Sequence, residues 1–182
     1  MFEDTAIQFL TKGGTFRVQS VSNSAPFWLH LPALAALTLL KDTSKGQHAR
    51  FIEAVKELKP SSSHRRMLVV PSSRNQPSVD FADASDRVYQ ATISLLKQPS
   101  FADLKEYLPA DSDRALNVYC VSPDFDVEFK LEDVVMNDRD LERIKLHVLH
   151  LPARLAGGGK ASSSGLVIYM LCHCGSCNAA TL

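Results

Sequence analysis

The chain has 182 residues, of which 45% are hydrophobic and 22% are charged, and its 20 basic residues balance its 20 acidic ones. This size and composition fit one globular domain and exclude an intrinsically disordered chain. The zero net charge removes any global electrostatic argument for binding nucleic acid or an anionic membrane. The most apolar stretch, residues 25–40, contains His30 and Pro32 and is too short to span a bilayer.

The cysteines favour a reducing compartment. Cys120 stands alone, whereas Cys172, Cys174 and Cys177 fall within six residues, a spacing that suits a metal or thiol site better than a disulfide framework. The sequence shows no secretory signal and no Asn-x-Ser/Thr sequon. We therefore expect a soluble protein of the cytoplasm or nucleus.

Charge is unevenly distributed along the chain. Residues 1–66 carry nine Lys or Arg against five Asp or Glu, and residues 111–142 carry ten acidic against three basic residues. Such a polarity can align copies head to tail or attract a basic partner, but two solvated faces are the simpler interpretation. The basic group at residues 64–66 with Arg74 is too sparse for a nucleic-acid footprint.

The first elements predicted in chain order are a β-hairpin and a helix. Residues 5–11 and 15–22 have β character on either side of Lys12-Gly13-Gly14, and a helix over residues 2–11 is the alternative. Pro32 suits the first position of a helix, and strong helix formers over residues 33–41 predict that helix.

The middle of the chain is predicted mostly as helices. A capping box at residues 44–47 predicts a helix with the apolar stripe Phe51, Ile52, Val55 and Leu58. Residues 67–71 are typical of a short buried strand, and residues 81–98 are predicted as a further helix. Ser100 caps a short helix that ends at Pro109.

The C-terminal third is predicted mostly as strands. Residues 115–121 and 126–131 favour two strands around a turn, and the alternation over residues 142–151 favours a third, with a helix capped by Asn137 or Asp138 as the alternative. Helices in the first half and strands in the second predict an α+β fold. In it, the N-terminal hairpin and the helices pack on a mostly antiparallel C-terminal sheet.

The sequence divides into three predicted parts. Residues 1–155 form a single globular α+β domain, and residues 156–165 are a linker rich in glycine and serine. Residues 166–182 contain an apolar strand, Leu166–Leu171, followed directly by the cysteine cluster. The apolar patch formed by Phe27, Trp28 and Leu29 is predicted to lie in the core and not in a partner groove.

The cysteine cluster predicts a zinc site. Three thiolates at the Cys-x-Cys-x-x-Cys spacing of Cys172, Cys174 and Cys177 can converge on one tetrahedral ion, because the turn at Gly175-Ser176 folds the third sulfur back. A water in the fourth position makes such a site catalytic, and a protein ligand makes it structural. The candidates for a fourth protein ligand are His147, His150, His173 and Cys120.

The segment from Cys172 to Thr181, Cys-His-Cys-Gly-Ser-Cys-Asn-Ala-Ala-Thr, resembles the zinc motif of glutathione-dependent formaldehyde-activating enzymes. The resemblance implies that Cys172, Cys174 and Cys177 bind a catalytic zinc ion in a carbon–sulfur lyase. It covers ten of the 182 residues. The second zinc ion of that family is held by an earlier Cys-x-Cys and a later cysteine pair. This sequence has no earlier Cys-x-Cys, and the five residues after Cys177 contain no cysteine.

Other chemistries remain open alternatives. Cys174-Gly175-Ser176-Cys177 has the spacing of a redox pair, and a strand that ends at His173 and Cys174 matches the placement of a cysteine hydrolase dyad. A redox pair of this kind requires a helix directly after it, and no helix is predicted there. A nucleophilic cysteine requires a base within hydrogen-bond reach and an oxyanion donor, which a single sequence does not identify.

A metal-dependent nuclease is a further alternative. Asp124, Asp126 and Glu128 share one face of a predicted strand, with Lys130 nearby, and carboxylates in this arrangement bind Mg²⁺. Asp111 or Asp113 opposite Glu128 would fit the geometry of such sites better.

No complete catalytic constellation can be assembled from these residues. We therefore predict a non-enzymatic interaction or assembly protein that binds a protein partner or self-associates, with zinc in the C-terminal cluster. The alternative is a zinc-dependent enzyme that uses Cys172, Cys174 and Cys177.

Overall fold

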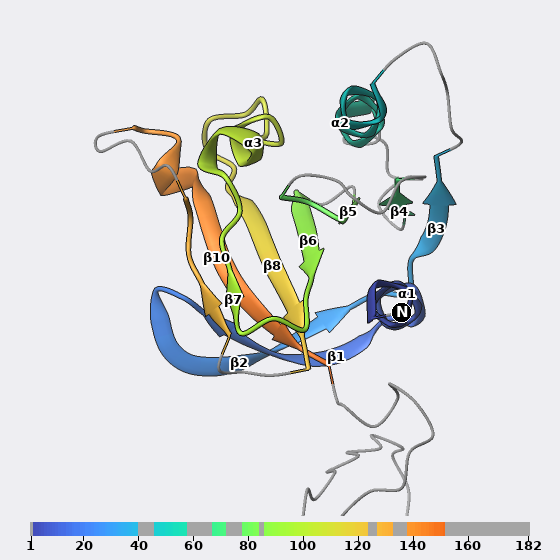
Figure 1. Ribbon diagram of the computed structural model, residues 1–182, viewed down its shortest axis with the longest axis vertical. Helices are drawn as coiled ribbons and strands as arrows, with labels where there is room; N and C mark the ends of the chain where they lie inside the picture. Colours follow the sequence, from blue (N-terminus) through green and yellow to red (C-terminus); the bar gives the residue numbers. More distant parts are fainter. Residues whose placement is uncertain are drawn as a thin grey trace, which may run out of the picture.

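The computed structural model describes residues 2–39, 46–57, 67–71, 78–83, 86–123, 127–132 and 138–151. Its main sheet is built from β1 (Gly14–Ser20), β2 (Asn23–Leu31), β3 (Ala35–Thr38), β4 (Met67–Val70), β5 (Phe81–Asp83), β6 (Arg87–Ala91), β8 (Leu116–Ser122) and β10 (Ile144–His150). The strand order is β2-β1-β10-β8-β6-β5-β4-β3 (Figure 1). A second sheet pairs β7 (Leu96–Lys97) with β9 (Glu128–Phe129).

The main sheet is mixed. β1 is antiparallel to β2 and β10, and β5 is antiparallel to β4 and β6, whereas β8 is parallel to both β6 and β10, and β3 is parallel to β4. The two long C-terminal strands are therefore parallel, where the sequence predicts a mostly antiparallel sheet. Residues 123–143 separate them, which is long enough for the crossover that a parallel pair requires.

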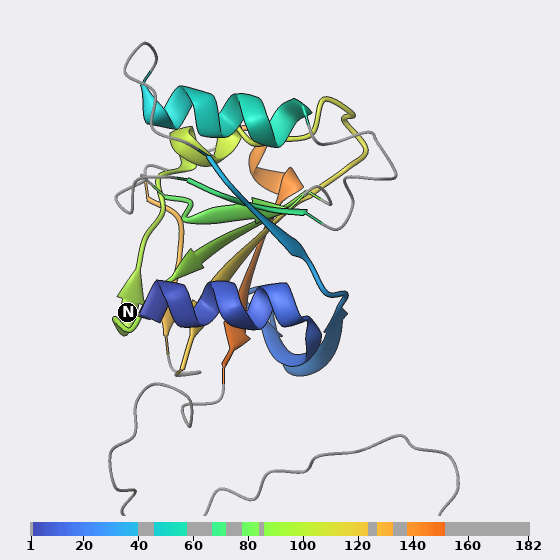
Figure 2. The ribbon, with the colours of Figure 1, turned by 90° about the vertical axis from the view of Figure 1, so that its right-hand side faces the viewer.

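Helices cover both faces of the sheet. Figure 2 shows α1 (Phe2–Lys12) on one side and α2 (Gln47–Glu57) with α3 (Phe101–Lys105) on the other. The buried residues accordingly form two clusters, one beneath α1 and one beneath α2 and α3. Both helices and a sheet are present, as the α+β prediction expects, but the sheet is mixed and not mostly antiparallel. No helix in the described ranges is long and apolar enough to cross a membrane.

The N-terminal prediction is half right. Residues 5–11 belong to helix α1, the alternative, because Ala6 and Leu10 lie one turn apart and are both fully buried against the sheet. Residues 15–20 form strand β1 as predicted. The predicted helix over residues 33–41 is wrong. Residues 35–38 pair with β4, and this tertiary pairing outweighs the local helix propensity of alanine and leucine.

The largest error concerns the predicted helix over residues 81–98, because the described residues of this range form strands β5, β6 and β7 and no helix. The periodicity that decides is two and not 3.6, since Val88 faces the cluster beneath α2 while Tyr89 and Ala91 belong to the cluster beneath α1. The strand at residues 67–70 and the strand at residues 116–122 are confirmed.

The two amphipathic helices of the middle region are also confirmed. The stripe Phe51, Ile52 and Val55 of α2 is buried, and the Ser100 hydroxyl accepts a hydrogen bond from the Asp103 N–H at the start of α3. In the C-terminal third, β9 is only two residues long, and residues 144–150 form a strand after a 3₁₀ turn, η1 (Leu141–Arg143). The predicted linker and C-terminal part, residues 156–182, lie outside the described residues.

Candidate functional site

The predicted zinc ligands Cys172, Cys174 and Cys177 lie outside the described residues, so a zinc site there stays a prediction of the sequence. Cys120, a candidate for the fourth ligand, lies on β8 in the core beneath α2 and α3 and is fully buried. Burial raises the pKa of its thiol to about 12. Because metals bind the thiolate form, Cys120 is poorly suited to join such a site.

The two histidines of β10 do not act together. They are three residues apart on one strand, so their side chains point to opposite faces of the sheet. Nε2 of His147 is 3.3 Å from Oδ1 of Asn117, and burial lowers the pKa of His147, with Lys145 adding to the shift, which favours the neutral ring. Nε2 of His150 donates to the Pro123 carbonyl oxygen at 2.8 Å.

The described residues do not bring together the carboxylates that the nuclease alternative requires. Glu128 on β9 forms an exposed ion pair with Lys130 at 2.8 Å. Asp111 and Asp113 lie in the turn before β8, where the Asp113 N–H donates to Oδ1 of Asp111. Asp124 and Asp126 fall outside the described residues. Within those residues, no group of three or more His, Cys, Asp or Glu side chains could hold a metal ion.

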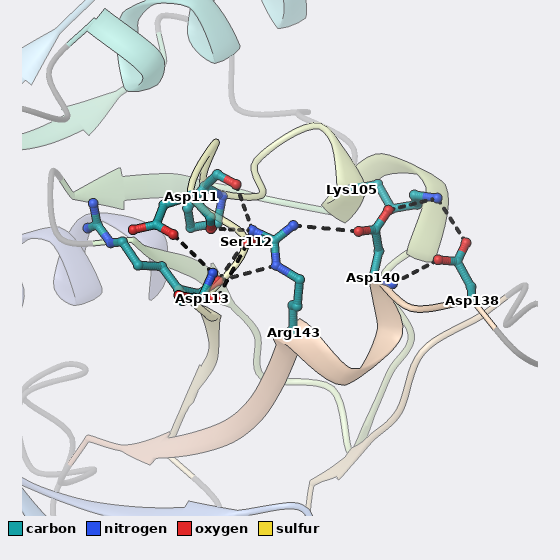
Figure 3. Close-up of polar contacts among 9 residues, drawn as sticks. Lys105, Asp111, Ser112, Asp113, Asp138, Asp140 and Arg143 are labelled. Atoms are coloured by element: carbon teal, nitrogen blue, oxygen red, sulfur yellow. Dashed lines mark hydrogen bonds and ion pairs between the residues drawn. The ribbon is translucent and has the colours of Figure 1, made fainter.

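Two acidic residues of the stretch 111–142, Asp138 and Asp140, form ion pairs with basic residues of the same chain. Nζ of Lys105, on α3, lies 2.8 Å from Asp138 and 3.2 Å from Asp140 (Figure 3). The guanidinium of Arg143 lies 3.5 Å from the Asp140 carboxylate and donates to the carbonyl oxygens of Pro109 and Asp111 at 2.6 and 2.8 Å. These contacts fasten the loop before β8 to the turn that precedes β10, which indicates a structural role.

A buried polar cluster lies on the sheet face that α1 covers. The Asp83 carboxylate is 1% exposed, accepts a hydrogen bond from the Tyr89 hydroxyl at 2.8 Å, and forms an ion pair with Nε of Arg87 at 2.8 Å. Burial and then the nearby Asp83 raise the pKa of Tyr89 well above its ordinary value, so this hydroxyl stays a donor. The cluster compensates its own charge, and we assign it to stability.

Aromatic rings extend from this cluster across the sheet. Tyr89, Tyr119 and His147 are paired on neighbouring strands, and their rings stack with centroids 5.5 and 5.0 Å apart. Phe27 of β2 meets His147 edge-on at 6.2 Å. The buried row therefore ends at a strand whose aromatic side chains reach solvent.

Strand β2 carries the exposed aromatic surface. The sequence predicts Phe27 and Trp28 in the core, but Phe27 is 41% and Trp28 is 71% exposed. The reason is topological: β2 is the last strand of the sheet, and its only neighbour among the described strands is β1. We call the stretch Phe27–Leu31 of β2 the β2 edge.

A second exposed apolar group surrounds β7. Ile93, Leu95 and Leu96 are 75%, 60% and 46% exposed. Strand β7 is only two residues long and is already paired with β9. This group therefore offers far fewer backbone hydrogen-bonding groups than the β2 edge does.

The Asp80 carboxyl, which precedes β5, makes stability depend on pH. It accepts a hydrogen bond from the Ala91 N–H at 2.8 Å, and burial raises its pKa to about 6, with the Ala91 N–H and Lys97 lowering it and the Glu3 carboxylate raising it. The folded protein thus holds this proton more tightly than the unfolded chain does. We expect protonation of Asp80 to contribute up to about 3 kcal/mol to the free energy of unfolding. This stabilisation is complete below pH 4 and is lost as the pH rises through 6.

Urea unfolding of the wild type and of Asp80→Asn between pH 4 and pH 7 measures this effect. The difference between their free energies of unfolding is expected to change across that interval. Parallel curves would mean that Asp80 does not bind its proton more tightly in the folded state.

Of the surfaces in the described residues, the β2 edge alone combines unpaired strand geometry with exposed aromatic side chains, and we take it as the candidate functional site. Comparisons of the chain with protein-family models, with curated proteins and with solved structures give no match.

Proposed function

We propose that this chain is an assembly protein that self-associates by pairing the β2 edge with the same strand of a second copy. The observation that supports this most directly is the exposure of Phe27 and Trp28 on the terminal strand of the eight-stranded sheet that the described residues form. A terminal strand presents a row of backbone N–H and C=O groups to its open side, and such a row pairs readily with another extended chain.

The position of Pro26 favours the second half of β2 as the pairing segment. Proline has no N–H to donate and is confined to edge strands or irregular positions. The ladder between β1 and β2 is regular from Gly14↔Leu31 to Val18↔Phe27 and shifts register before Ser20↔Asn23, around Pro26. Five regular residues, Phe27–Leu31, are therefore suited to pair on the open side as well.

The chemistry of β2 favours a second copy as the partner. None of its nine residues is Asp, Glu, Lys or Arg, and its one ionisable side chain is His30. Two antiparallel copies of this strand, related by a two-fold axis, place no like charges opposite each other. Charged side chains are the usual protection of an exposed edge, and the β2 edge lacks them.

Substitution of Trp28 by lysine tests the proposal. A lysine on the strand places two ammonium groups close together in the pair and removes the largest exposed aromatic side chain, so we expect the dissociation constant for self-association to rise about tenfold or more. Sedimentation equilibrium of the full chain over a range of concentrations measures it. Because Trp28 is exposed, the variant is expected to fold normally.

Ile93→Lys is the matched control. It introduces the same charge at an equally exposed apolar residue away from β2, and it is expected to leave self-association unchanged. Equal self-association in the wild type and in Trp28→Lys would refute the proposal. If only Ile93→Lys weakened self-association, the interface would instead involve the exposed apolar residues around β7, Ile93, Leu95 and Leu96.

A further inference from the structure

We propose that the segment Leu166–Leu171 of the same chain adds to the β2 edge as a further strand and so competes with the second copy. This inference rests on the proposed function, because it names a second occupant of the same edge. Its support comes from the place where β10 ends, the length of the chain that follows, and the chemistry of the two segments.

The chain leaves the sheet close to β2. Strand β10 ends at His150, which pairs with Arg17 of β1, and Arg17 pairs with Trp28 of β2. Neighbouring strands are about 4.8 Å apart, so a strand added outside β2 lies roughly 15 Å from the end of β10. The end of β10 and the β2 edge are therefore at the same level of the sheet.

The following segment has a suitable length. Fourteen residues, 152–165, separate Leu151 from Leu166, and the ten from residue 156 onward are mostly glycine, serine and alanine. For a sequence of this length that is rich in glycine and serine, chain statistics give a root-mean-square span of roughly 20 Å. A linker of this span bridges the 15 Å gap without being stretched and without a large surplus of length.

The two segments are chemically alike. Leu166–Leu171 reads Leu-Val-Ile-Tyr-Met-Leu, with neither charge nor proline, and its six residues are enough to pair along the five residues of the β2 edge. All six residues of the segment are apolar, a pattern that suits a strand with apolar neighbours on both faces. Because β10 ends level with Trp28 and runs parallel to β2, a strand added by the shortest route would be antiparallel to β2 and would enter beside Leu31.

Competition follows from the linkage within one chain. A segment on a short flexible linker has an effective concentration in the millimolar range at its site, whereas a second copy is present at micromolar concentration in an ordinary measurement. The segment of the same chain therefore occupies the edge first, and self-association increases when that segment cannot pair.

Trp28 is the only tryptophan of the chain, so its fluorescence reports on this edge alone. The experiment compares the full wild-type chain with Ile168→Pro, since proline at the middle of the segment removes a ladder donor. We expect about a twofold increase in acrylamide quenching of Trp28 at low protein concentration, and self-association about tenfold tighter. Ser163→Pro, in the linker, is the matched control and is expected to behave as the wild type.

Equal quenching and equal self-association in Ile168→Pro and wild type would overturn the inference. It would leave the proposed function standing if Trp28→Lys still weakened self-association. Conversely, increased quenching in Ile168→Pro, with no effect of Trp28→Lys on self-association in that background, would support the added strand and refute pairing with a second copy.

Discussion

Replacing Asp83 by alanine is expected to lower the free energy of unfolding by about 3–5 kcal/mol. The carboxylate is fully buried and is the acceptor for the Tyr89 hydroxyl and the counter-charge for Arg87. Its removal leaves a cation largely buried without this partner and a buried hydroxyl without its acceptor. Urea denaturation followed by circular dichroism measures the loss, with Asp83→Asn expected to fall between alanine and wild type because its amide oxygen still accepts.

Glu128→Ala is the control for this prediction. The Glu128–Lys130 pair has the same 2.8 Å separation, but its side chains are 62% and 52% exposed. Water screens such pairs, so the expected loss is at most about 1 kcal/mol. Similar losses in Asp83→Ala and Glu128→Ala would show that burial does not determine the contribution of the Asp83 cluster.

Gly13→Ala is expected to destabilise the protein by about 2–5 kcal/mol. Gly13 ends α1 with φ at +68°, a conformation that costs an L-residue about 1–2 kcal/mol. A Cβ there would also lie 2.6 Å from the backbone of Pro32 and Ala33 and 2.8 Å from the Leu31 carbonyl oxygen. Because backbone atoms cannot move aside as a flexible side chain does, relief requires a shift of α1 or β2 that costs about 1–3 kcal/mol more.

The matched control is Gly46→Ala, just before α2. No atom of the described residues lies within 4 Å of the position of its Cβ, and its φ is not positive. We expect a change of less than about 1 kcal/mol, with the sign set by the lower entropy of the unfolded chain. Thermal unfolding of both variants measures the difference, and a Gly13→Ala protein as stable as Gly46→Ala would contradict the predicted close approach.

Gly13→Ala and Asp83→Ala perturb different parts of the main sheet. Gly13 joins α1 to β1 and lies against the backbone at the end of β2. The packing of α1 against β1 and β2 therefore depends on this close approach. If Gly13→Ala remains folded, its self-association shows whether the position of the β2 edge depends on α1. Asp83→Ala acts at β5 and β6, on the same face of the sheet that α1 covers.

Local sequence patterns predicted those elements whose periodicity and boundaries agree. Helix α2 has an apolar stripe, and helix α3 has a serine cap and buried Phe101 and Leu104 on one side. Strands β4 and β8 are short apolar runs between polar segments. In each of these, one face or the whole element is buried in the way the pattern requires, so tertiary contacts reinforce the local preference.

Residues 81–98 show where local patterns fail. Polar residues in this region, including Asp83, Arg87 and Gln90, weaken the alternation expected of a strand, but they are largely buried in the structure. Asp83 and Arg87 compensate one another across the β5–β6 pair. A buried polar pair that forms only when two strands are adjacent leaves no signal of its own in a single sequence.

The candidate site was missed for a related reason. Phe27 and Trp28 are apolar, and an apolar run by itself predicts burial. Whether a strand lies in the middle of a sheet or at its edge depends on the order of all eight strands, which involves pairs as distant as Arg17 with His150. The proposal that β2 mediates self-association thus depends on the strand order, which the apolar composition of Phe27 and Trp28 does not reveal.

What the sequence by itself determined is therefore local: a single-domain composition, the amphipathic helices α2 and α3, the apolar strands β4 and β8, and an uncharged segment at Leu166–Leu171. Only the tertiary structure decided that α1 and not a strand begins the chain, that β8 and β10 are parallel, and that Trp28 faces solvent at the edge of the sheet. The physical reason is that strand pairing and exposure are set by long-range contacts, whereas helical stripes and caps are contained within a few consecutive turns.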